Sequence, residues 1–218
     1  MTETVVVASA TAETEAKPRV NRRQVAKART RLKVLEAARN LFAERGYDSA
    51  TIRDIAKGAG MSTGAVFANF QDKAELFEAV FAEEMAALAE DFAAGIAIDD
   101  TTAARLAGGL TAGYHRALDH LPLMQAMVAR SWFQPEDADK RVREFLAPIM
   151  SALTEVLQAG IAKGELRQDI EVALIARMVW DAYLSNFRRA AYDNWGIEEL
   201  TPLVRKQMDV LLAGQQAK

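Results

Sequence analysis

The sequence predicts an all-α protein with a basic N-terminal segment and a larger acidic body. Apolar residues recur at helical spacing, and no segment shows the strict alternation of a half-buried strand. Residues 17–73 carry 13 Lys and Arg against 5 Asp and Glu, whereas residues 74–218 carry 14 against 22. A basic segment on an acidic body is typical of a nucleic-acid-binding surface, although an ordinary solvated charge run gives the same count.

Composition narrows the class of protein further. The chain has 218 residues, 50% of them hydrophobic, which is enough for one or two domains with their own cores. It has no cysteine, which excludes disulfides and thiolate metal sites and fits a reducing cytoplasm. No apolar run approaches the ~20 residues of a membrane span, and the acidic start does not resemble a secretory signal. We therefore expect a soluble, cytoplasmic protein.

The chain begins with a small, polar and acidic stretch, residues 1–20, which we predict to be a disordered tail. A run without acidic residues overlaps its end, with basic side chains at Lys17, Arg19, Arg22, Arg23, Lys27, Arg29, Arg31 and Lys33. Part of this run extends the first helix, and the rest forms an arm along phosphates or in the minor groove. The first helix proper is expected from about Thr30 to Arg45, with Gly46 as its stop.

The most informative motif of the sequence lies in residues 51–70, TIRDIAKGAGMSTGAVFANF. Thr51 followed by Asp54 forms a capping box, which marks the start of a short helix. The glycines at 58 and 60 end this helix in a tight turn, and Ser62 is placed to cap a second helix. Two short helices joined by a glycine turn predict a helix-turn-helix, whose second helix enters the major groove of DNA.

Helices account for the rest of the chain. Asp72 is a good N-cap for a long helix ending near Ala94, and Pro122 and Pro135 suit first turns. Five more helices are expected at about 102–119, 121–132, 135–163, 169–192 and 198–213.

The stretch around residues 51–76 resembles the DNA-binding signature of the tetracycline-repressor (TetR) family of bacterial transcriptional regulators. The matching positions are Thr51, Ile55-Ala56, Ala59-Gly60-Met61-Ser62-Thr63-Gly64, Phe67, Phe70 and Asp72-Lys73-Ala74-Glu75-Leu76. The resemblance implies a helix-turn-helix domain over residues 21–75 and a ligand-binding and dimerisation domain over residues 76–218. The basic run and the resemblance together predict DNA contacts from Arg29, Arg31, Thr51, Ser62, Thr63, Gly64, Ala65, Phe67, Asn69 and Lys73.

One position departs from the family pattern. Phe67 stands where the family usually has Tyr, so a hydroxyl contact to phosphate is missing. Its ring can still pack under the helix or touch a sugar or a thymine methyl. Phosphate affinity then depends more on the arginine-rich run, and we expect an unusually salt-sensitive interaction with DNA.

A single recognition helix gives little specificity, so we expect a homodimer on a palindromic operator in double-stranded DNA. The last two helices are the predicted dimer surface, because apolar residues cover more of them than one intramolecular face requires. Those residues are Val172, Ile175, Ala176, Val179, Tyr183 and Phe187 in one helix, and Leu203, Val204, Met208, Leu211 and Leu212 in the other.

The middle helices carry large, adaptable side chains that suit a pocket for a small hydrophobic or aromatic effector. The candidates are His115, Met127, Arg130, Trp132, Met150, Trp180, Tyr183 and Phe187. The same side chains equally suit a plain hydrophobic core. To regulate DNA binding, such an effector must bind more tightly to the conformation with one spacing of the two DNA-binding domains than to the other, and so shift the population toward it.

Catalysis finds little support, and we expect no enzyme, no metal and no cofactor. His115 and His120 lie five residues apart, which does not place them on one helix face as zinc ligands, and no nucleophile motif or phosphate-binding loop is present. The main hypothesis is a ligand-released repressor that is nucleoid-associated when bound to DNA. The alternatives are an α-helical enzyme or binding protein whose helix-turn-helix is only architectural, an activator, and a nucleoid protein without an effector.

Overall fold

A computed structural model describes residues 22–97, 100–131 and 136–217. Within these ranges all the regular secondary structure is helical, apart from one isolated bridge between Leu166 and Gln216. The prediction of an all-α chain is therefore confirmed. Residues 1–21, on which the predicted tail falls, lie outside the described residues, as do 98–99, 132–135 and 218.

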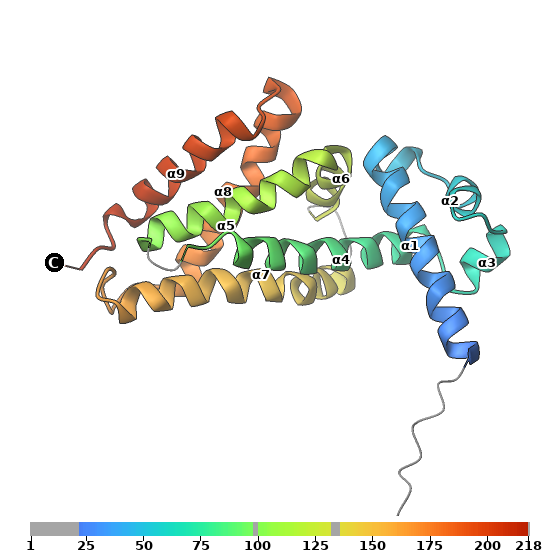
Figure 1. The fold of residues 1–218 in the computed structure, drawn as a ribbon, viewed down its shortest axis with the longest axis horizontal. Helices are drawn as coiled ribbons and strands as arrows, with labels where there is room; N and C mark the ends of the chain where they lie inside the picture. Colours follow the sequence, from blue (N-terminus) through green and yellow to red (C-terminus); the bar gives the residue numbers. More distant parts are fainter. Residues whose placement is uncertain (1–21, 98–99, 132–135, 218) are drawn as a thin grey trace, which may run out of the picture.

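The N-terminal region consists of α1 (Arg22–Ser49), α2 (Ile52–Gly58) and α3 (Thr63–Phe67), which lie together at one end of the molecule (Figure 1). α1 is helical from Arg22, eight residues before Thr30, so part of the basic run extends the first helix as predicted. Gly46 ends the regular helix with φ 74°, a left-handed conformation that glycine adopts without strain. The predicted stop is confirmed.

α4 (Lys73–Ala94) leaves this end and runs into the helical body, so one continuous helix belongs to both regions (Figure 1). Its start is fixed as the sequence predicted, because the Asp72 carboxylate accepts a hydrogen bond from the backbone N–H of Glu75 at 2.8 Å. The Glu75 side chain reciprocates by accepting from the N–H of Gln71 at 2.6 Å.

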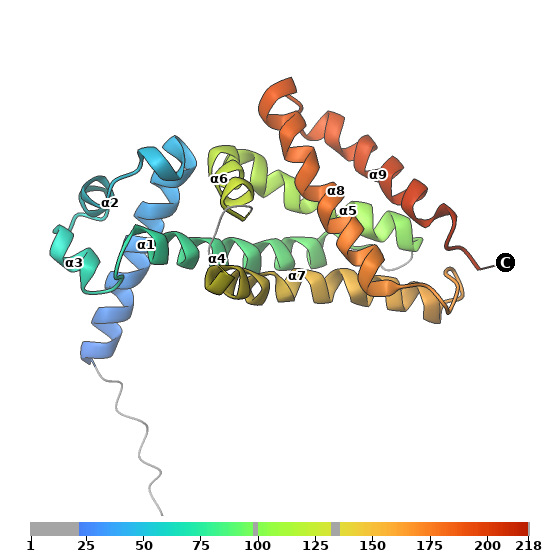
Figure 2. The ribbon, with the colours of Figure 1, turned by 180° about the vertical axis from the view of Figure 1, so that it is seen from behind.

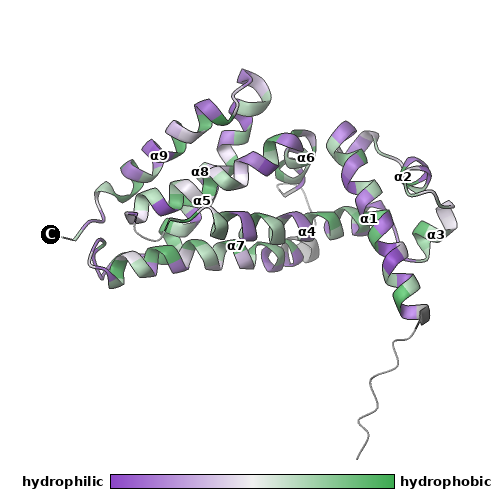
Figure 3. Cartoon of the chain, viewed as in Figure 1, coloured by the Kyte–Doolittle hydropathy of each residue, from purple (hydrophilic) through white to green (hydrophobic). Residues whose placement is uncertain are grey.

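The body adds α5 (Thr102–Asp119), α6 (Leu121–Ser131), α7 (Glu136–Ala162), α8 (Val172–Asp193) and α9 (Ile197–Ala213). These bounds agree with the predicted helices to within three residues. α7 runs beside α4, while α5 packs between α4 and α9, as the front and rear views both show (Figures 1 and 2). Every long helix mixes apolar and polar residues along its length, as expected for helices with one buried face (Figure 3).

Glycines let α4 and α5 approach closely. A Cβ atom on Gly109 would lie 2.5 Å from the buried ring of Phe92, and one on Gly113 would lie 2.4 Å from Leu88 Cδ1. The side chains of α4 therefore occupy the space that larger residues on α5 would take. This contact fixes the position of α4 relative to the body, and α4 in turn positions the helix-turn-helix.

One segment of α7, Lys140–Ala162, has a mean hydropathy of 1.4 and is long and apolar enough to cross a membrane by length and composition alone. The sequence alone had led us to expect no apolar run of this length. In the structure this segment packs against α4, α5 and α8, as a helix of a folded domain does.

Candidate nucleic-acid interface and its link to the helical body

The helix-turn-helix is built by the local signals that the sequence contains. The hydroxyl of Thr51 accepts from the N–H of Asp54 at 3.2 Å and donates to its carboxylate at 2.6 Å. Ser62 caps α3 by accepting from the N–H of Ala65 at 3.2 Å. Gly60 has φ +66°, which closes the turn between the two helices. Both helix starts and the turn are as predicted.

α3 presents one face to solvent and buries the other. Val66 and Phe70 are buried, whereas Ser62, Thr63, Gly64, Phe67 and Ala68 are exposed. The ring of Phe67 is 54% exposed, so it does not pack under the helix in the isolated protein. Thr63, Gly64 and Phe67 of the predicted DNA contacts are thus accessible, with Ala65 half-buried at the edge of this face.

Two of the predicted DNA contacts serve the local fold. The Asn69 side-chain amide donates to the carbonyl of Ala65 at 2.9 Å, and the backbone carbonyl of Asn69 accepts from Arg31 Nη1 at 2.9 Å. The Arg31 guanidinium also lies over the Phe70 ring, 4.1 Å from its centroid. Arg31 therefore joins α1 to the end of α3, and neither its guanidinium nor the Asn69 amide nitrogen is free in this state.

Lys73, another of the predicted DNA contacts, is also engaged within the chain. Its ammonium donates to the backbone carbonyls of Tyr47 at 2.9 Å and Ala50 at 3.0 Å, at the end of α1. It also lies 4.2 Å from the centroid of the Tyr47 ring. Because the last carbonyls of a helix lack intrahelical partners, this lysine satisfies groups that would otherwise need water. Its role as a phosphate contact stays a prediction.

Exposed cations that the sequence analysis did not select as contacts surround the motif. Arg29 is exposed as predicted, and so are Lys27 on α1 and both Arg53 and Lys57 on α2. The positions of Lys27 and Arg29 follow from the extension of α1 toward Arg22, which makes both of them helix-surface residues. Arg53 and Lys57 belong to the motif itself. They lie on either side of buried Ile55 and Ala56, so helical spacing could have predicted that both are exposed.

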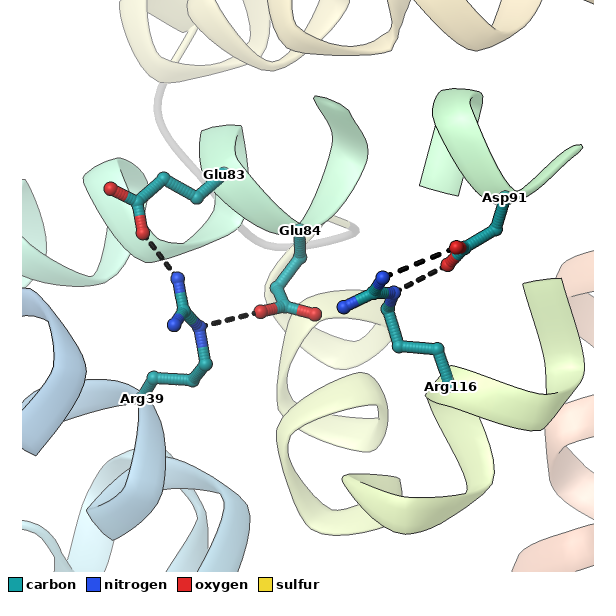
Figure 4. Close-up of polar contacts among 5 residues, drawn as sticks. All are labelled: Arg39, Glu83, Glu84, Asp91 and Arg116. Atoms are coloured by element: carbon teal, nitrogen blue, oxygen red, sulfur yellow. Dashed lines mark hydrogen bonds and ion pairs between the residues drawn. The ribbon is translucent and has the colours of Figure 1, made fainter. Parts of the chain in front are cut away.

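A group of ion pairs joins the helix-turn-helix to the body. Arg39 of α1 pairs with both Glu83 and Glu84 of α4, the second at 2.7 Å between Nε and Oε1. Glu84 is one of the few charged groups that the described residues bury, at 7% exposed. Figure 4 shows its carboxylate between the guanidinium groups of Arg39 and Arg116, and Arg116 also forms a two-pronged pair with Asp91.

A second link uses α6. The guanidinium of Arg130 lies 4.0 Å from the centroid of the Tyr47 ring and 5.6 Å from that of Phe77. The same Tyr47 ring packs edge-on against Phe77 at 4.9 Å. Arg130, predicted as a ligand anchor, thus lies at the junction between α6 and the helix-turn-helix.

The body contains an open, mostly apolar groove of about 500 Å³ between α6 and α8. Its lining residues are Gln125, Val128, Ala129, Leu184, Ser185, Phe187, Arg188, Ala191 and Tyr192. Of the predicted ligand residues that the structure describes, only Phe187 lines it. The guanidinium of Arg188 lies over the Tyr192 ring at 5.1 Å, so one cation stands in the groove wall.

A polar network connects α5, α8 and α9 inside the body. The Tyr114 hydroxyl donates to the backbone carbonyl of Tyr183 at 2.8 Å and accepts from the Asn186 amide at 3.1 Å. Asn186 exchanges two hydrogen bonds with Gln207 of α9. Burial raises the pKa of both tyrosines, so both phenols remain neutral at physiological pH. The network ties α5, α8 and α9 together, and no sequence signal selected Asn186 or Gln207.

The other predicted ligand residues do not form one pocket. Met127, Trp180 and Tyr183 are buried in the core, where Trp180 stacks on Tyr183 at 5.4 Å, and Met150 is half-buried against it. His115 is exposed on α5 and lines neither the groove nor the core. Trp132 lies outside the described residues. Adaptable side chains at helical spacing here mainly form core, the alternative that the sequence left open.

The described residues contain no group of three or more His, Asp and Glu side chains that could hold a metal ion. A short, capped helix-turn-helix with an exposed second helix and exposed cations beside it defines a DNA-binding protein of the helix-turn-helix class.

Comparison with known proteins identifies the family. The profile described as "Bacterial regulatory proteins, tetR family" matches residues 34–80. The chain is 32% identical over 160 residues to the HTH-type transcriptional repressor KstR2 of Mycobacterium tuberculosis, covering 68% of this chain and 74% of the relative. It is 28% identical over 182 residues to the repressor AcnR of Corynebacterium efficiens, covering 80% and 90%. The chain therefore belongs to the TetR family of bacterial transcriptional regulators.

Solved structures agree on the fold. The transcriptional regulator FadR of Bacillus subtilis, solved in complex with stearoyl-CoA, has a TM-score of 0.71 over 81% of this chain and 96% of its own, at 20% identity. FadR of Bacillus halodurans gives a TM-score of 0.69 over 82% and 94%, at 19% identity.

We expect Arg39→Gln to lower the free energy of unfolding by roughly 1–3 kcal/mol, because it leaves Glu84 buried without its cation. The loss stays below that of a fully buried pair because the Arg39 side chain is 28% exposed. Urea denaturation provides the measurement. The matched control is Arg45→Gln, whose pair with Glu44 is exposed on both sides and should change stability by less than about 0.5 kcal/mol. Equal effects of the two substitutions would show that the link contributes nothing.

Proposed function

We propose that this chain is a dimeric repressor that binds a palindromic operator and is released by a small, largely apolar effector. The observation that carries the proposal is the solvent-facing α3, with Thr63, Gly64 and Phe67 exposed beside the cations of α1 and α2. Relatives named as repressors support the same role. We infer a regulator rather than an enzyme, acting in the bacterial cytoplasm and on the nucleoid when bound.

We propose that residues 21–75 bind DNA and that residues 76–218 bind the effector and a second subunit. α4 belongs to both units, and its ion pairs with Arg39 provide a contact through which movement in the body reaches α1. The predicted contacts divide in this proposal. Thr63, Gly64, Ala65 and Phe67 face the bases, Arg29, Thr51 and Ser62 lie near phosphates, and Arg31, Asn69 and Lys73 hold α3 and α4 in place.

The homodimer is proposed to form through α8 and α9. The residues that the sequence analysis chose for this surface are mostly buried within one chain, including Ile175, Val179 and Val204. Other residues on the same helices support the interface better, because Leu174, Met178 and Val210 are large, apolar and exposed. Exposed apolar side chains on two neighbouring helices are typical of a protein–protein contact surface.

The groove between α6 and α8 is the proposed effector site. Its volume of about 500 Å³ falls in the range of small-molecule pockets, and its lining is mostly apolar. Arg188 supplies one cation for an anionic head group. FadR of Bacillus subtilis was solved with stearoyl-CoA, which supports an amphipathic acyl compound as the class to test. On α6, next to the groove residue Ala129, Arg130 contacts Tyr47 of the DNA-binding region.

The purified protein should recover one or a few palindromic sites from fragmented genomic DNA at near-physiological salt, read by sequencing. A palindrome is expected because a two-fold dimer presents two α3 helices to equivalent half-sites. Uniform recovery that disappears at modest salt would reduce the activity to non-specific phosphate binding and would contradict the repressor proposal.

Met178→Asp should shift the protein from dimer to monomer and weaken operator binding by at least tenfold, because it places a charge in the proposed interface. Light scattering coupled to size-exclusion chromatography measures the mass. The control is Gln158→Asp, an exposed position on α7, which should stay dimeric. A dimeric Met178→Asp protein would place the interface elsewhere.

Ala129→Trp should fill the groove and weaken binding of stearoyl-CoA by at least tenfold while leaving operator affinity unchanged. Ala147→Trp, a second exposed alanine on a helix, is the matched control and should bind the probe normally. Calorimetry measures the affinities. If Ala129→Trp bound stearoyl-CoA with wild-type affinity, the groove would be excluded as the effector site. If the wild-type protein did not bind stearoyl-CoA, acyl compounds would be excluded as the effector class.

A further inference from the structure

The face of α3 that points to solvent is poor in groups that can hydrogen-bond to bases. Residues 58–70 contain no Arg, Lys, His, Gln, Asp or Glu, and their polar side chains are Ser62, Thr63 and Asn69. The side chains that read guanine and adenine by paired hydrogen bonds are mainly Arg, Lys, Asn and Gln. Asn69 is therefore the only side chain in this stretch that could make such a contact.

The structure removes Asn69 from that role. Its amide nitrogen is used by the carbonyl of Ala65, and its Oδ1 atom is buried without a hydrogen-bond partner among the described residues. Ser62 already accepts the cap hydrogen bond from Ala65. The nearest cations, Arg31 and Lys73, are held by backbone carbonyls and aromatic rings. Thr63 is left as the main polar reader on this face.

What α3 does present is apolar surface. Phe67 is 54% exposed, the methyl group of Ala68 follows it, and Gly64 leaves the backbone accessible. An aromatic ring with half its surface in water is unfavourable, and covering it contributes to binding. Its position on the second helix of the motif places it where the major groove lies in a complex.

The major groove offers one distinctive apolar group, the C5-methyl of thymine. We infer that Phe67, with Ala68 beside it, reads thymine methyl groups, so that each operator half-site carries at least one thymine under α3. Sequence specificity then depends on methyl contacts and on Thr63, while the exposed cations of α1 and α2 supply phosphate contacts. This inference rests on the proposed function, because it needs α3 to enter the groove.

Uracil tests the inference, since it lacks only this methyl group and keeps the base pairing of thymine. Randomised duplexes made with thymine are first selected with the purified protein. Each thymine of the selected site is then replaced in turn by uracil, and affinities are measured by fluorescence anisotropy at fixed salt. One position in each half-site should lose about fourfold per methyl, or about fifteenfold for both half-sites together.

Substitutions at Phe67 test whether this residue causes the loss of affinity for uracil-containing sites. Phe67→Ala, which alters an exposed side chain and should fold by circular dichroism, is expected to bind thymine and uracil sites equally. Phe67→Tyr keeps the ring and should keep the discrimination. Lys57→Ala, at an exposed cation of α2, should weaken both sites by the same factor and reduce the salt slope by about one.

The outcomes separate this inference from the proposed function. A selected site that tolerates uracil at every position within about twofold, half the loss expected for one methyl, overturns methyl reading and leaves the repressor proposal intact. Persistent discrimination in Phe67→Ala shows that another residue reads the methyl, which also overturns the inference. A thymine library that yields no enriched site contradicts the proposed function itself.

Discussion

The contact of Arg39 with Glu83 and Glu84 links the N-terminal helices to the body. One cation on the DNA-binding side meets two carboxylates on α4, the helix that both regions share. A buried carboxylate such as Glu84 is costly without a cation beside it, so this ion pair favours the observed position of α1 along α4. Arg116, on the far side of Glu84, extends the same constraint to α5 (Figure 4).

The contact at Tyr47 adds a second constraint from another direction. Lys73 of α4 and Arg130 of α6 both lie against this ring, so three helices meet at the end of α1. α6 also forms one wall of the groove. A ligand changes the position of α6 only if it binds one arrangement better than the other, and the energy that it can transmit equals that difference in affinity. The contact of Arg130 with Tyr47 therefore connects the helix of the groove wall directly to the DNA-binding region.

Local signals made most of the fold predictable from the sequence. Caps at Thr51, Ser62 and Asp72 and the stop at Gly46 act over three or four residues, and all of them lie as expected. The extent to which the basic run lengthens α1 before Thr30 was not predictable, because that run lacks the apolar spacing from which helix bounds were placed. Asn69 and Lys73 were predicted as DNA contacts from the resemblance, which does not show their contacts within the chain. Lys73 donates to the carbonyl of Tyr47, 26 residues away, and the backbone carbonyl of Asn69 accepts from Arg31, 38 residues away. Spacing alone could not show that these groups were already occupied.

The residues of the motif have two different roles, and for this reason recognising the motif does not predict which DNA sequence it binds. Its residues divide into those that build the helix pair, such as Ile55, Val66 and Phe70, and those that face outward, such as Thr63 and Phe67. Only the outward-facing residues can distinguish one operator from another. In this chain they include few polar side chains that could hydrogen-bond to bases, together with the exposed ring of Phe67. With so few readers on each α3, a monomer has little basis for discrimination, because each contact is worth only a few kcal/mol at most. In the proposed dimer, two copies of α3 at a fixed spacing multiply that small preference. The Arg39 and Tyr47 contacts fasten α1 to α4 and α6, and in this proposal they help to fix that spacing.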